Sequence, residues 1–472
     1  MANKRTTSAD SAWAQAGIDL HLDLRGSGLR AGLGEALREA VRSGRLAPGT
    51  RLPSSRTLAE DLGIARSTVT ECYSALVEEG WLVARHGSGT HVAHRAEAAR
   101  APERSAAPPR RSPHELEPGA ADYAEFPRAV WLSAARRALT AAPHSAFGYG
   151  DPLGRMELRT ALADYLSRVR GVYADPARIV ITSGFHHGLG ILARALRGQG
   201  VGTIAVEAYG LDIYRDVLSD DGMSIPALEI DEGGAQVDAL SALEPGSAAL
   251  LTPAHQFPLG FALSAERRHA LLDWARRTGG VVLEDDYDGE FRYDRRPVGA
   301  LQGLDPDHVV YFGTASKSVA PALRLAWVVV PEHLLPAVER AKGRVDTVSV
   351  LDQLIFTDFV TSGAFDRHVR GRRHSYRARR EQLVSALDAQ APEVRVVGMP
   401  AGLQAVLQLP EGTEASILEA AARRGLVVSG LSEFRHPDAA GSPWGSGLVA
   451  NFSSVSDSAW PAALQSLVAA VS

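Results

Sequence analysis

The chain has 472 residues, 45% of them hydrophobic and 22% charged, which is typical of a soluble globular protein of about three domains and excludes wholesale disorder and a membrane bundle. The only cysteine, Cys72, excludes an internal disulfide framework and a cysteine-based zinc cluster, so no metal is expected. The net charge of -5 divides into +4 over residues 1–114, with 16 Lys and Arg against 12 Asp and Glu, and -9 over the remainder. This asymmetry indicates an N-terminal part that tolerates a polyanion, with an ordinary solvated surface as the alternative.

Apolar residues at helical spacing predict three short helices near the N-terminus. The three apolar stripes are Leu33, Leu37, Ala40 and Val41; Leu58, Ala59 and Leu62; and Val69, Cys72, Tyr73, Leu76 and Val77. Gly63 and Gly80 end the second and third helices. Residues 81–92 then form an apolar strand, a glycine turn and a returning strand, so the sequence predicts a small α+β winged helix-turn-helix. Cys72 lies on an apolar face, which favours a buried core residue over a redox sensor.

The second helix of a helix-turn-helix enters the major groove of DNA, so long or polar side chains are expected at its start. Arg66 can donate two hydrogen bonds to guanine or bind a phosphate, and the hydroxyls of Ser67 and Thr68 suit either. Further DNA-contacting candidates are Ser54, Ser55 and Arg56 at the start of the preceding helix, and Arg85, His86, Gly87, Gly89 and Thr90 in the wing. A winged helix that binds protein is the alternative.

Residues 94–115 are rich in Ala, Pro and Arg and show no apolar periodicity. This composition predicts a flexible linker between a DNA-binding domain over 18–93 and a larger domain over 116–472. A long surface loop within one domain is the alternative, but its length disfavours that interpretation.

After the linker, short apolar runs alternate with helical stretches. The runs cover residues 178–182, 203–206, 248–252, 280–283, 309–312 and 325–330. Continuous apolar strands of this kind are buried on both faces, so the sequence predicts an α/β domain with a mainly parallel sheet.

Polar and charged residues follow several of these runs in the combination that an aldehyde cofactor such as pyridoxal phosphate requires. Lys317 supplies an amine for a Schiff base, and Asp285 supplies a carboxylate for the ring nitrogen. Tyr287 can hydrogen-bond the ring hydroxyl. The phosphate-binding candidates are Arg324, the hydroxyls of Thr314 and Ser316, and the helix start at Ser183, Gly184 and Phe185.

Two alternatives remain open in this region. The acidic run 284–288 could bind a metal, although no histidine accompanies it locally. His255 and Gln256 lie in a neighbouring loop, where either could contact the ring hydroxyl or an effector.

The N-terminal motifs resemble the GntR-type DNA-binding domain. They read GTRLPSSR at 49–56, RSTV at 66–69, EGW at 79–81 and GSGT at 87–90. Ala65 departs from the serine that the family often has as a helix cap, and losing a cap costs about 1 kcal/mol.

The C-terminal part resembles fold type I aminotransferases, and more narrowly the MocR subgroup, which joins a GntR-type domain to an aminotransferase-like domain. The stretches that carry this resemblance are FGYGDPLG at 147–154, TPAHQFPLG at 252–260, EDDYDGEF at 284–291 and GTASKSVAPALRLAW at 313–327. The resemblance implies a large α/β fold, bound pyridoxal phosphate, the roles given above for Lys317, Asp285, Tyr287 and Arg324, and a homodimer in which domains can be swapped.

Two departures from the aminotransferase pattern concern the substrate side. Amino-acid-binding relatives tend to carry a carboxylate-binding arginine in a context like Arg-Leu-Asn-Phe, where this chain has Val449-Ala450-Asn451-Phe452, and Arg435 is a weak substitute. The sequence EAYGL at 207–211 replaces Glu-x-Pro-Gly-Tyr, which moves or removes an aromatic that would stack on the ring.

The leading hypothesis is a transcription regulator that binds an operator in double-stranded DNA and senses an effector, either pyridoxal phosphate itself or an amine or amino acid. Sensing of pyridoxal phosphate would make it a regulator of vitamin B6 metabolism of the pyridoxine-biosynthesis type. An active aminotransferase with a DNA-binding appendage is the alternative, and the absence of the carboxylate-binding arginine disfavours it. A third hypothesis is a protein-binding scaffold in which neither the DNA-binding site nor the cofactor site is functional. No apolar run reaches the roughly 18 residues of a membrane span, and none follows Lys4 and Arg5 as in a secretory signal, so a cytoplasmic location without a membrane partner is expected.

Overall fold

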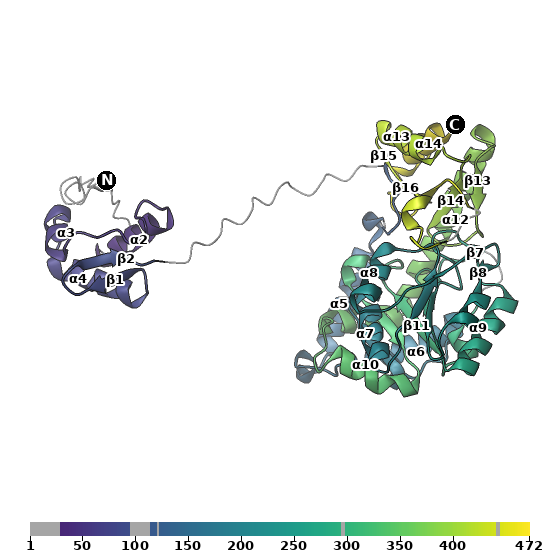
Figure 1. Cartoon of the computed structure of the whole chain (residues 1–472), viewed down its shortest axis with the longest axis horizontal. Coiled ribbons are helices and arrows are strands. Elements are labelled where there is room, and N and C mark those ends of the chain that lie inside the picture. The colour runs from purple at the N-terminus through teal and green to yellow at the C-terminus, as the bar shows by residue number, and fades with distance from the viewer. Residues whose placement is uncertain (1–28, 95–113, 120–121, 294–297, 440–443) are drawn as a thin grey trace. The chain divides into compact units, whose positions relative to one another are not determined.

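The computed structural model of the chain describes residues 29–94, 114–119, 122–293, 298–439 and 444–472. The chain divides into two compact units, Met1–Pro109 and Arg110–Ser472 (Figure 1). Residues 95–113, which make up most of the predicted linker, lie outside the described residues, so the linker stays a prediction. No described helix is both long enough and apolar enough to cross a bilayer.

The described residues of the N-terminal unit form a winged helix-turn-helix, as predicted. Its elements are α2 (Leu29–Arg42), α3 (Ser55–Leu62), α4 (Arg66–Glu78) and the antiparallel strands β1 (Leu82–Arg85) and β2 (Gly89–Val92). The apolar stripes of the three helices meet in one core, where Leu33, Leu58 and Val69 are fully buried. Cys72 belongs to this core, and burial raises the pKa of its thiol to about 11, which agrees with a structural role.

The second unit is built on a mixed sheet of seven strands within its described residues. In spatial order these strands are β4 (Ile179–Thr182), β12 (Ala326–Val329), β11 (Val309–Thr314), β10 (Val281–Asp285), β9 (Ala248–Leu251), β5 (Ile204–Glu207) and β6 (Ala227–Leu228). Only β12 runs antiparallel to its neighbours among these strands, so the mainly parallel sheet is confirmed. Each of the six predicted strands coincides with an observed one.

Successive residues of the central strands pack on opposite faces of the sheet. In β10, Val281 and Leu283 join a core covered by helices α7 and α10, whereas Val282 joins the core under α9 (Figure 1). The helices that follow or flank the sheet are α5 (Arg128–Ala141), α6 (Met156–Arg170), α7 (Phe185–Arg197), α8 (Asp212–Asp220), α9 (Ala265–Thr278), α10 (Leu335–Lys342) and α11 (Val350–Thr361). Burial on both faces explains why the strands are continuously apolar.

A C-terminal part with its own antiparallel sheet packs beside the main sheet, and the sequence analysis did not predict it. The long helix α12 (Ala364–Gln390) leads into it. Its other elements are the strands β13 (Arg395–Val397), β14 (Gln404–Gln408), β17 (Gly447–Asn451) and β16 (Ser429–Gly430), and the helices α13 (Glu414–Arg423) and α14 (Trp460–Val471). Two short hairpin strands, β7 (Ile230–Asp231) and β8 (Gly234–Ala235), lie between β6 and β9 along the chain.

The last two residues of the predicted linker and the segment that follows them are joined to this C-terminal part. Strand β3 (His114–Glu115) pairs in parallel with β15 (Leu426–Val427). Beyond β3, the carbonyl of Glu117 accepts a hydrogen bond of 2.9 Å from Asn451 Nδ2. The segment is therefore held by strand pairing and by a side chain at the end of β17.

Candidate functional site

The predicted DNA-contacting residues lie at exposed or half-buried positions of the winged helix. Ser54 Oγ caps α3 by accepting from the amide of Thr57 at 3.1 Å, and α4 begins after Ala65, whose side chain supplies no cap. Arg66 and Ser67 are exposed and Thr68 is half-buried on the first turn of α4. The start of α4 is therefore accessible to a ligand, although one of its amides is less well satisfied than a serine cap would allow.

The wing is a tight turn between β1 and β2. Gly87 and Gly89 have φ of 78° and 93°, the left-handed region that glycine adopts without strain. Arg85 and His86 are exposed on the turn, and Thr90 is half-buried on β2. The sequence analysis did not predict Thr57, Thr70 and Ser74, which line one groove together with Ser54, Ser55 and Thr90. Hydroxyl spacing on helices that are separate in the sequence gave no signal for that groove.

Arg56 differs from Arg66 in its contacts. Arg56 Nε donates to Glu60 Oε1 at 3.0 Å, one turn along α3. Arg66 makes no ion pair with any residue that the structure describes. Of the two arginines, Arg66 therefore keeps its guanidinium available for an external anion.

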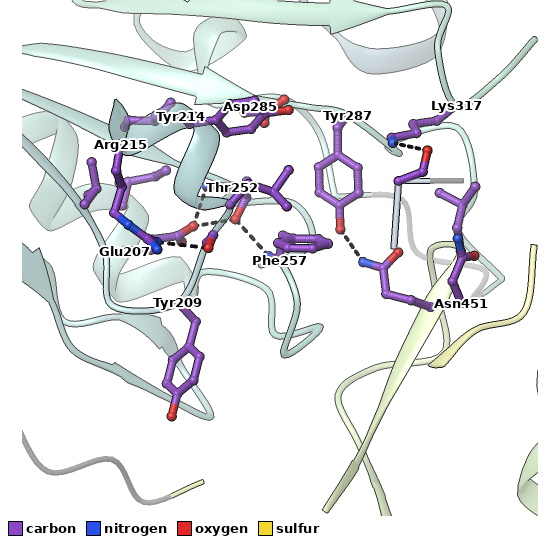
Figure 2. A pocket seen from close by; sticks show the side chains of 18 residues that line it. Glu207, Tyr209, Tyr214, Arg215, Thr252, Phe257, Asp285, Tyr287, Lys317 and Asn451 are labelled. Atoms are coloured by element: carbon purple, nitrogen blue, oxygen red, sulfur yellow. Dashed lines mark hydrogen bonds between the residues drawn. The ribbon is translucent and has the colours of Figure 1, made fainter. Parts of the chain in front are cut away.

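In the second unit, a cavity opens at the carboxyl ends of the parallel strands (Figure 2). Three predicted residues line it together: Asp285 at the end of β10, Tyr287 two residues on, and Lys317 in the segment after β11. Other polar and aromatic lining residues are Glu207, Tyr209, Tyr214, Arg215, Thr252, Phe257, Gln404 and Asn451. The structure therefore brings the predicted amine, carboxylate and phenol to one site.

Lys317 and Asp285 influence each other's protonation. Burial lowers the pKa of the Lys317 amine, while the carboxylates of Asp285 and Asp288 oppose that shift. Burial, then the neighbouring Asp286 and Asp288, raise the pKa of Asp285 well above its usual range. A lowered amine pKa increases the neutral, nucleophilic fraction, and a cationic ligand group beside Asp285 would restore its ionised form.

The phenol of Tyr287 is held from two sides. Gln404 Nε2 donates to Tyr287 Oη at 3.0 Å, and His255 Nδ1 lies 3.2 Å from the same oxygen. His255 Nδ1 also lies 2.7 Å from Asp288 Oδ2, a shorter contact that fixes the imidazole. Burial raises the pKa of Tyr287 well above its usual value, so the phenol keeps its proton for donation. His255 thus lies behind Tyr287 and outside the cavity lining.

Gln256 corrects one expectation. Its side chain is fully buried and absent from the cavity lining, and its Nε2 donates to the carbonyl of Tyr209 at 3.0 Å. Because the amide holds the backbone of the 252–260 loop against the end of β5, Gln256 positions the cavity wall.

The predicted phosphate-binding residues meet at the same edge of the sheet, although outside the lining of this cavity. Arg324 Nη2 donates to the carbonyl of Ser183 at 2.8 Å, and Thr314 Oγ1 lies 3.0 Å from Ser316 Oγ. Gly184 begins α7 with φ of 89°, and a Cβ there would lie 2.9 Å from Arg324 Nη2. A glycine is therefore required where the arginine approaches the amides of the helix start.

Phe185 contributes to this edge through its backbone. Its ring is buried and packs on Tyr214 and Phe312, with ring centroids 4.6 Å and 4.9 Å away. Only the main-chain amide at the first turn of α7 remains for an anion. The ring instead supports Tyr214, an aromatic cavity residue that the sequence analysis did not identify.

The departures on the substrate side are visible in the structure. Val449, which stands where a carboxylate-binding arginine was sought, is fully buried in β17. Asn451, two residues on, lines the cavity, and its Oδ1 accepts from the amide of Ser453 at 3.0 Å. Arg435 is exposed, and its Nη2 donates to the carbonyl of Ala439 at 3.1 Å. Tyr209 also lines the cavity, so the altered motif keeps an aromatic in the wall.

The cavity residues that the sequence analysis did not identify have one feature in common, which is their distance along the chain from Lys317. Tyr214 and Arg215 lie on α8, and Gln404 begins a strand of the C-terminal sheet, far from Lys317 along the sequence. Glu207 alone had a usable signal, because it ends strand β5 at the same carboxyl edge as Asp285.

These groups fit pyridoxal phosphate. An amine of lowered pKa, a buried carboxylate and a protonated phenol face one cavity, and beside it Gly184 leaves the space that lets Arg324 lie against a helix start. Together they match the aldehyde, ring nitrogen, ring hydroxyl and phosphate of that cofactor.

Comparison with known proteins agrees with both units. The family model "Bacterial regulatory proteins, gntR family" matches residues 29–92, and "Aminotransferase class I and II" matches residues 116–445. The chain is 32% identical over 414 residues to the HTH-type transcriptional regulator YdeL of Bacillus subtilis, covering 85% of this chain and 89% of that protein. It is 32% identical to the HTH-type pyridoxine biosynthesis transcriptional regulator PdxR of Corynebacterium glutamicum, covering 85% and 88%. It is 33% identical to the probable rhizopine catabolism regulatory protein MocR of Rhizobium meliloti, covering 85% and 86%.

Solved structures give the same fold for the second unit. Kynurenine aminotransferase from Pyrococcus horikoshii matches with a TM-score of 0.67 at 23% identity, covering 76% of this chain and 91% of that one. An archaeal alanine:glyoxylate aminotransferase matches with the same TM-score at 25% identity, covering 76% and 90%. The fold and the site define a DNA-binding transcription regulator with an aminotransferase-type domain that binds pyridoxal phosphate. The chain belongs to the MocR-type family of GntR regulators.

Proposed function

We propose that the chain controls transcription by binding an operator through residues 18–93 and a small-molecule effector through residues 116–472, with residues 94–115 as the flexible linker. The observation that carries this proposal is the cavity in which Lys317 and Asp285 lie together, in a chain whose other unit is a winged helix-turn-helix. Because such a regulator acts on chromosomal DNA, its location is cytoplasmic.

Pyridoxal phosphate supplies an aldehyde and a ring that withdraws electrons when its nitrogen is protonated. Lys317 presents the amine for the aldehyde, Asp285 holds the proton on the ring nitrogen, and Tyr287 donates to the ring hydroxyl. His255 keeps Tyr287 oriented through the contacts described above. The phosphate-binding set is Arg324, Thr314, Ser316 and the helix start at Ser183, Gly184 and Phe185.

The effector is either pyridoxal phosphate itself or an amine or amino acid. Sensing of the cofactor, which would make the chain a regulator of vitamin B6 metabolism, is supported by the relative named for pyridoxine biosynthesis and by Val449 in the place of a carboxylate-binding arginine. Effector binding changes operator affinity only to the extent that it favours one conformation of the protein over another.

A homodimer, in swapped or unswapped form, is part of the proposal. Apolar side chains are exposed on and near α5, among them Leu132 at 69%, Phe147 at 54% and Met156 at 50%. Several large apolar side chains exposed along one stretch of the chain, residues 132–156, are typical of a protein interface. The expected result is a dimeric mass in light scattering, which Leu132→Asp should shift toward the monomer; a monomeric parent would contradict it.

The test is an operator-binding assay on the full chain with and without pyridoxal phosphate, beside Lys317→Ala. We expect the vitamer to change the affinity or the bend of the bound DNA in the parent only. Unchanged binding in both proteins would refute the proposal. An amino and keto acid panel addresses the aminotransferase alternative, because repeated turnover supports an enzyme whereas a single half-reaction does not.

A further inference from the structure

Helix α8 places a second cation on the cavity wall. Arg215 lines the same cavity as Lys317 and Asp285 and is half-buried there (Figure 2). Its Nη1 donates to the carbonyls of Gly210 at 2.9 Å and Phe434 at 3.4 Å, which fixes the direction of the side chain. The guanidinium is therefore positioned by the backbone on either side of the cavity wall.

The guanidinium of Arg215 has donor nitrogens left for a ligand, because only its Nη1 donates hydrogen bonds to residues that the structure describes. Within the described parts of the chain, neither Nε nor Nη2 of Arg215 has a hydrogen-bond acceptor, and the side chain forms no salt bridge. Burial lowers the pKa of Arg215, and only Asp212 and Asp216 of its own helix oppose that shift. A partly buried cation without a counter-ion is costly, so an anion that entered the cavity would be stabilised.

The other polar residues of the cavity lining are not available to bind an anionic group. Glu207 is acidic, and its carboxylate accepts from the amide of Thr252 at 3.1 Å. Asn451 is neutral and is engaged with Glu117 and Ser453. Lys317 is committed to the cofactor aldehyde in the proposed function.

Arg324, the arginine assigned to the cofactor phosphate, lies outside the cavity lining. Among the described lining residues, Arg215 is thus the cation available to a second anionic group.

We propose that Arg215 binds an anionic group of the effector, so that the effector is an amino acid or a similar amine carrying a carboxylate. This inference rests on the proposed function and narrows its ligand class: a plain amine lacks the recognised group, and the cofactor phosphate is recognised elsewhere. Arg215 therefore takes the specificity role for which no arginine is present at position 449.

The test uses the full chain loaded with pyridoxal phosphate and ligands in matched pairs: alanine beside ethylamine, and phenylalanine beside phenylethylamine. The change in the visible absorbance of the bound cofactor gives Kd for each ligand. The variants are Arg215→Met, which removes the charge but keeps the stem, Arg215→Lys, which keeps the charge, and Arg435→Met as a matched control on an exposed arginine.

We expect the parent to bind at least one of the two amino acids about tenfold or more tightly than the matching amine, which is the effect of one charge-assisted hydrogen bond. Arg215→Met should lose that preference with little change in amine affinity, Arg215→Lys should keep part of it, and Arg435→Met should match the parent. A purely structural role of Arg215 would weaken acid and amine equally, which would overturn the inference, as would a parent without any preference for the acid.

A second arm separates the sources of the anion. The apo forms of the parent and of Arg215→Met are titrated with pyridoxal phosphate and with pyridoxal. A loss of affinity in the variant for the phosphate ester alone would assign Arg215 to the cofactor and overturn the inference. A parent that takes up no pyridoxal phosphate would refute the proposed function itself, whereas normal uptake with unchanged acid preference in Arg215→Met refutes only the role of Arg215.

Discussion

Replacing Gly184 by alanine should weaken cofactor binding because the glycine leaves space for Arg324. Gly184 has φ of 89° and ψ of 165°, a backbone region that is almost confined to glycine. The new Cβ would lie 2.9 Å from Arg324 Nη2, whereas ordinary contact begins at 3.4 Å, so the guanidinium must retreat by about 0.5 Å. A retreat of the guanidinium disturbs the hydrogen bond of 2.8 Å that Arg324 Nη2 donates to the carbonyl of Ser183.

The magnitude follows from two costs. The strained backbone costs about 1–3 kcal/mol of stability. Losing one hydrogen bond from a charged group to the phosphate costs about 1.5–3 kcal/mol of binding, which corresponds to roughly tenfold to hundredfold in Kd. Stability and cofactor affinity should therefore both fall in Gly184→Ala.

The assay is titration of the apoprotein with pyridoxal phosphate, followed by visible absorbance. Gly246→Ala is the matched control, because Gly246 has φ of 79° but no atom within 4 Å of the added Cβ. It should lose stability and retain cofactor affinity. Unchanged affinity in Gly184→Ala, or an equal loss in the control, would refute the assignment of Arg324 to the phosphate.

Three further outcomes are expected. Ala65→Ser supplies the missing cap of α4 and should raise the free energy of unfolding of the N-terminal unit by about 1 kcal/mol in calorimetry; no change would show that the cap is irrelevant. Arg66→Ala should weaken operator binding by about 1–3 kcal/mol in fluorescence anisotropy, and Arg56→Ala should weaken it less because Glu60 already pairs with Arg56; the reverse order would contradict this interpretation. Burial raises the pKa of Glu207 to about 7 from a usual 4.5, so its contribution to stability is present below pH 4.5 and is lost as pH rises to 7. Glu207→Gln should remove up to about 3 kcal/mol of that dependence in urea unfolding at pH 5 and pH 8, and an unchanged slope would argue against a protonated acid.

The sequence predicted the central sheet well because its strands are buried on both faces. Runs such as 309–312 and 325–330 are continuously apolar, and the observed strands Val309–Thr314 and Ala326–Val329 differ from them by one or two residues at the ends. The same burial placed Asp285 and Lys317 at strand ends, where their chemistry was recognisable. The antiparallel direction of β12 had no counterpart in its composition.

Side chains that reach the cavity from other elements were not predictable in this way. Gln404 contacts Tyr287 across 117 positions of sequence, and nothing around Gln404 distinguishes it from a surface glutamine. Its strand, Gln404–Gln408, is short and belongs to the sheet that was missed altogether. Arg215 lies on a nine-residue helix whose register toward the cavity is set by tertiary packing. Gln256 was misjudged for the same reason, because only the folded loop shows that its amide points at backbone.

The segment 114–119, where the predicted linker ends, contacts two residues that line the cavity. Lys317 Nζ lies 3.4 Å from the carbonyl of Gly119, and Asn451, which lines the cavity, holds Glu117. Any molecule that takes the Lys317 amine removes that amine from Gly119, a few residues beyond the end of the predicted linker. The residues at the end of the predicted linker are therefore held by the same side chains that line the cavity, so occupation of the cavity changes the contacts of the chain at that point.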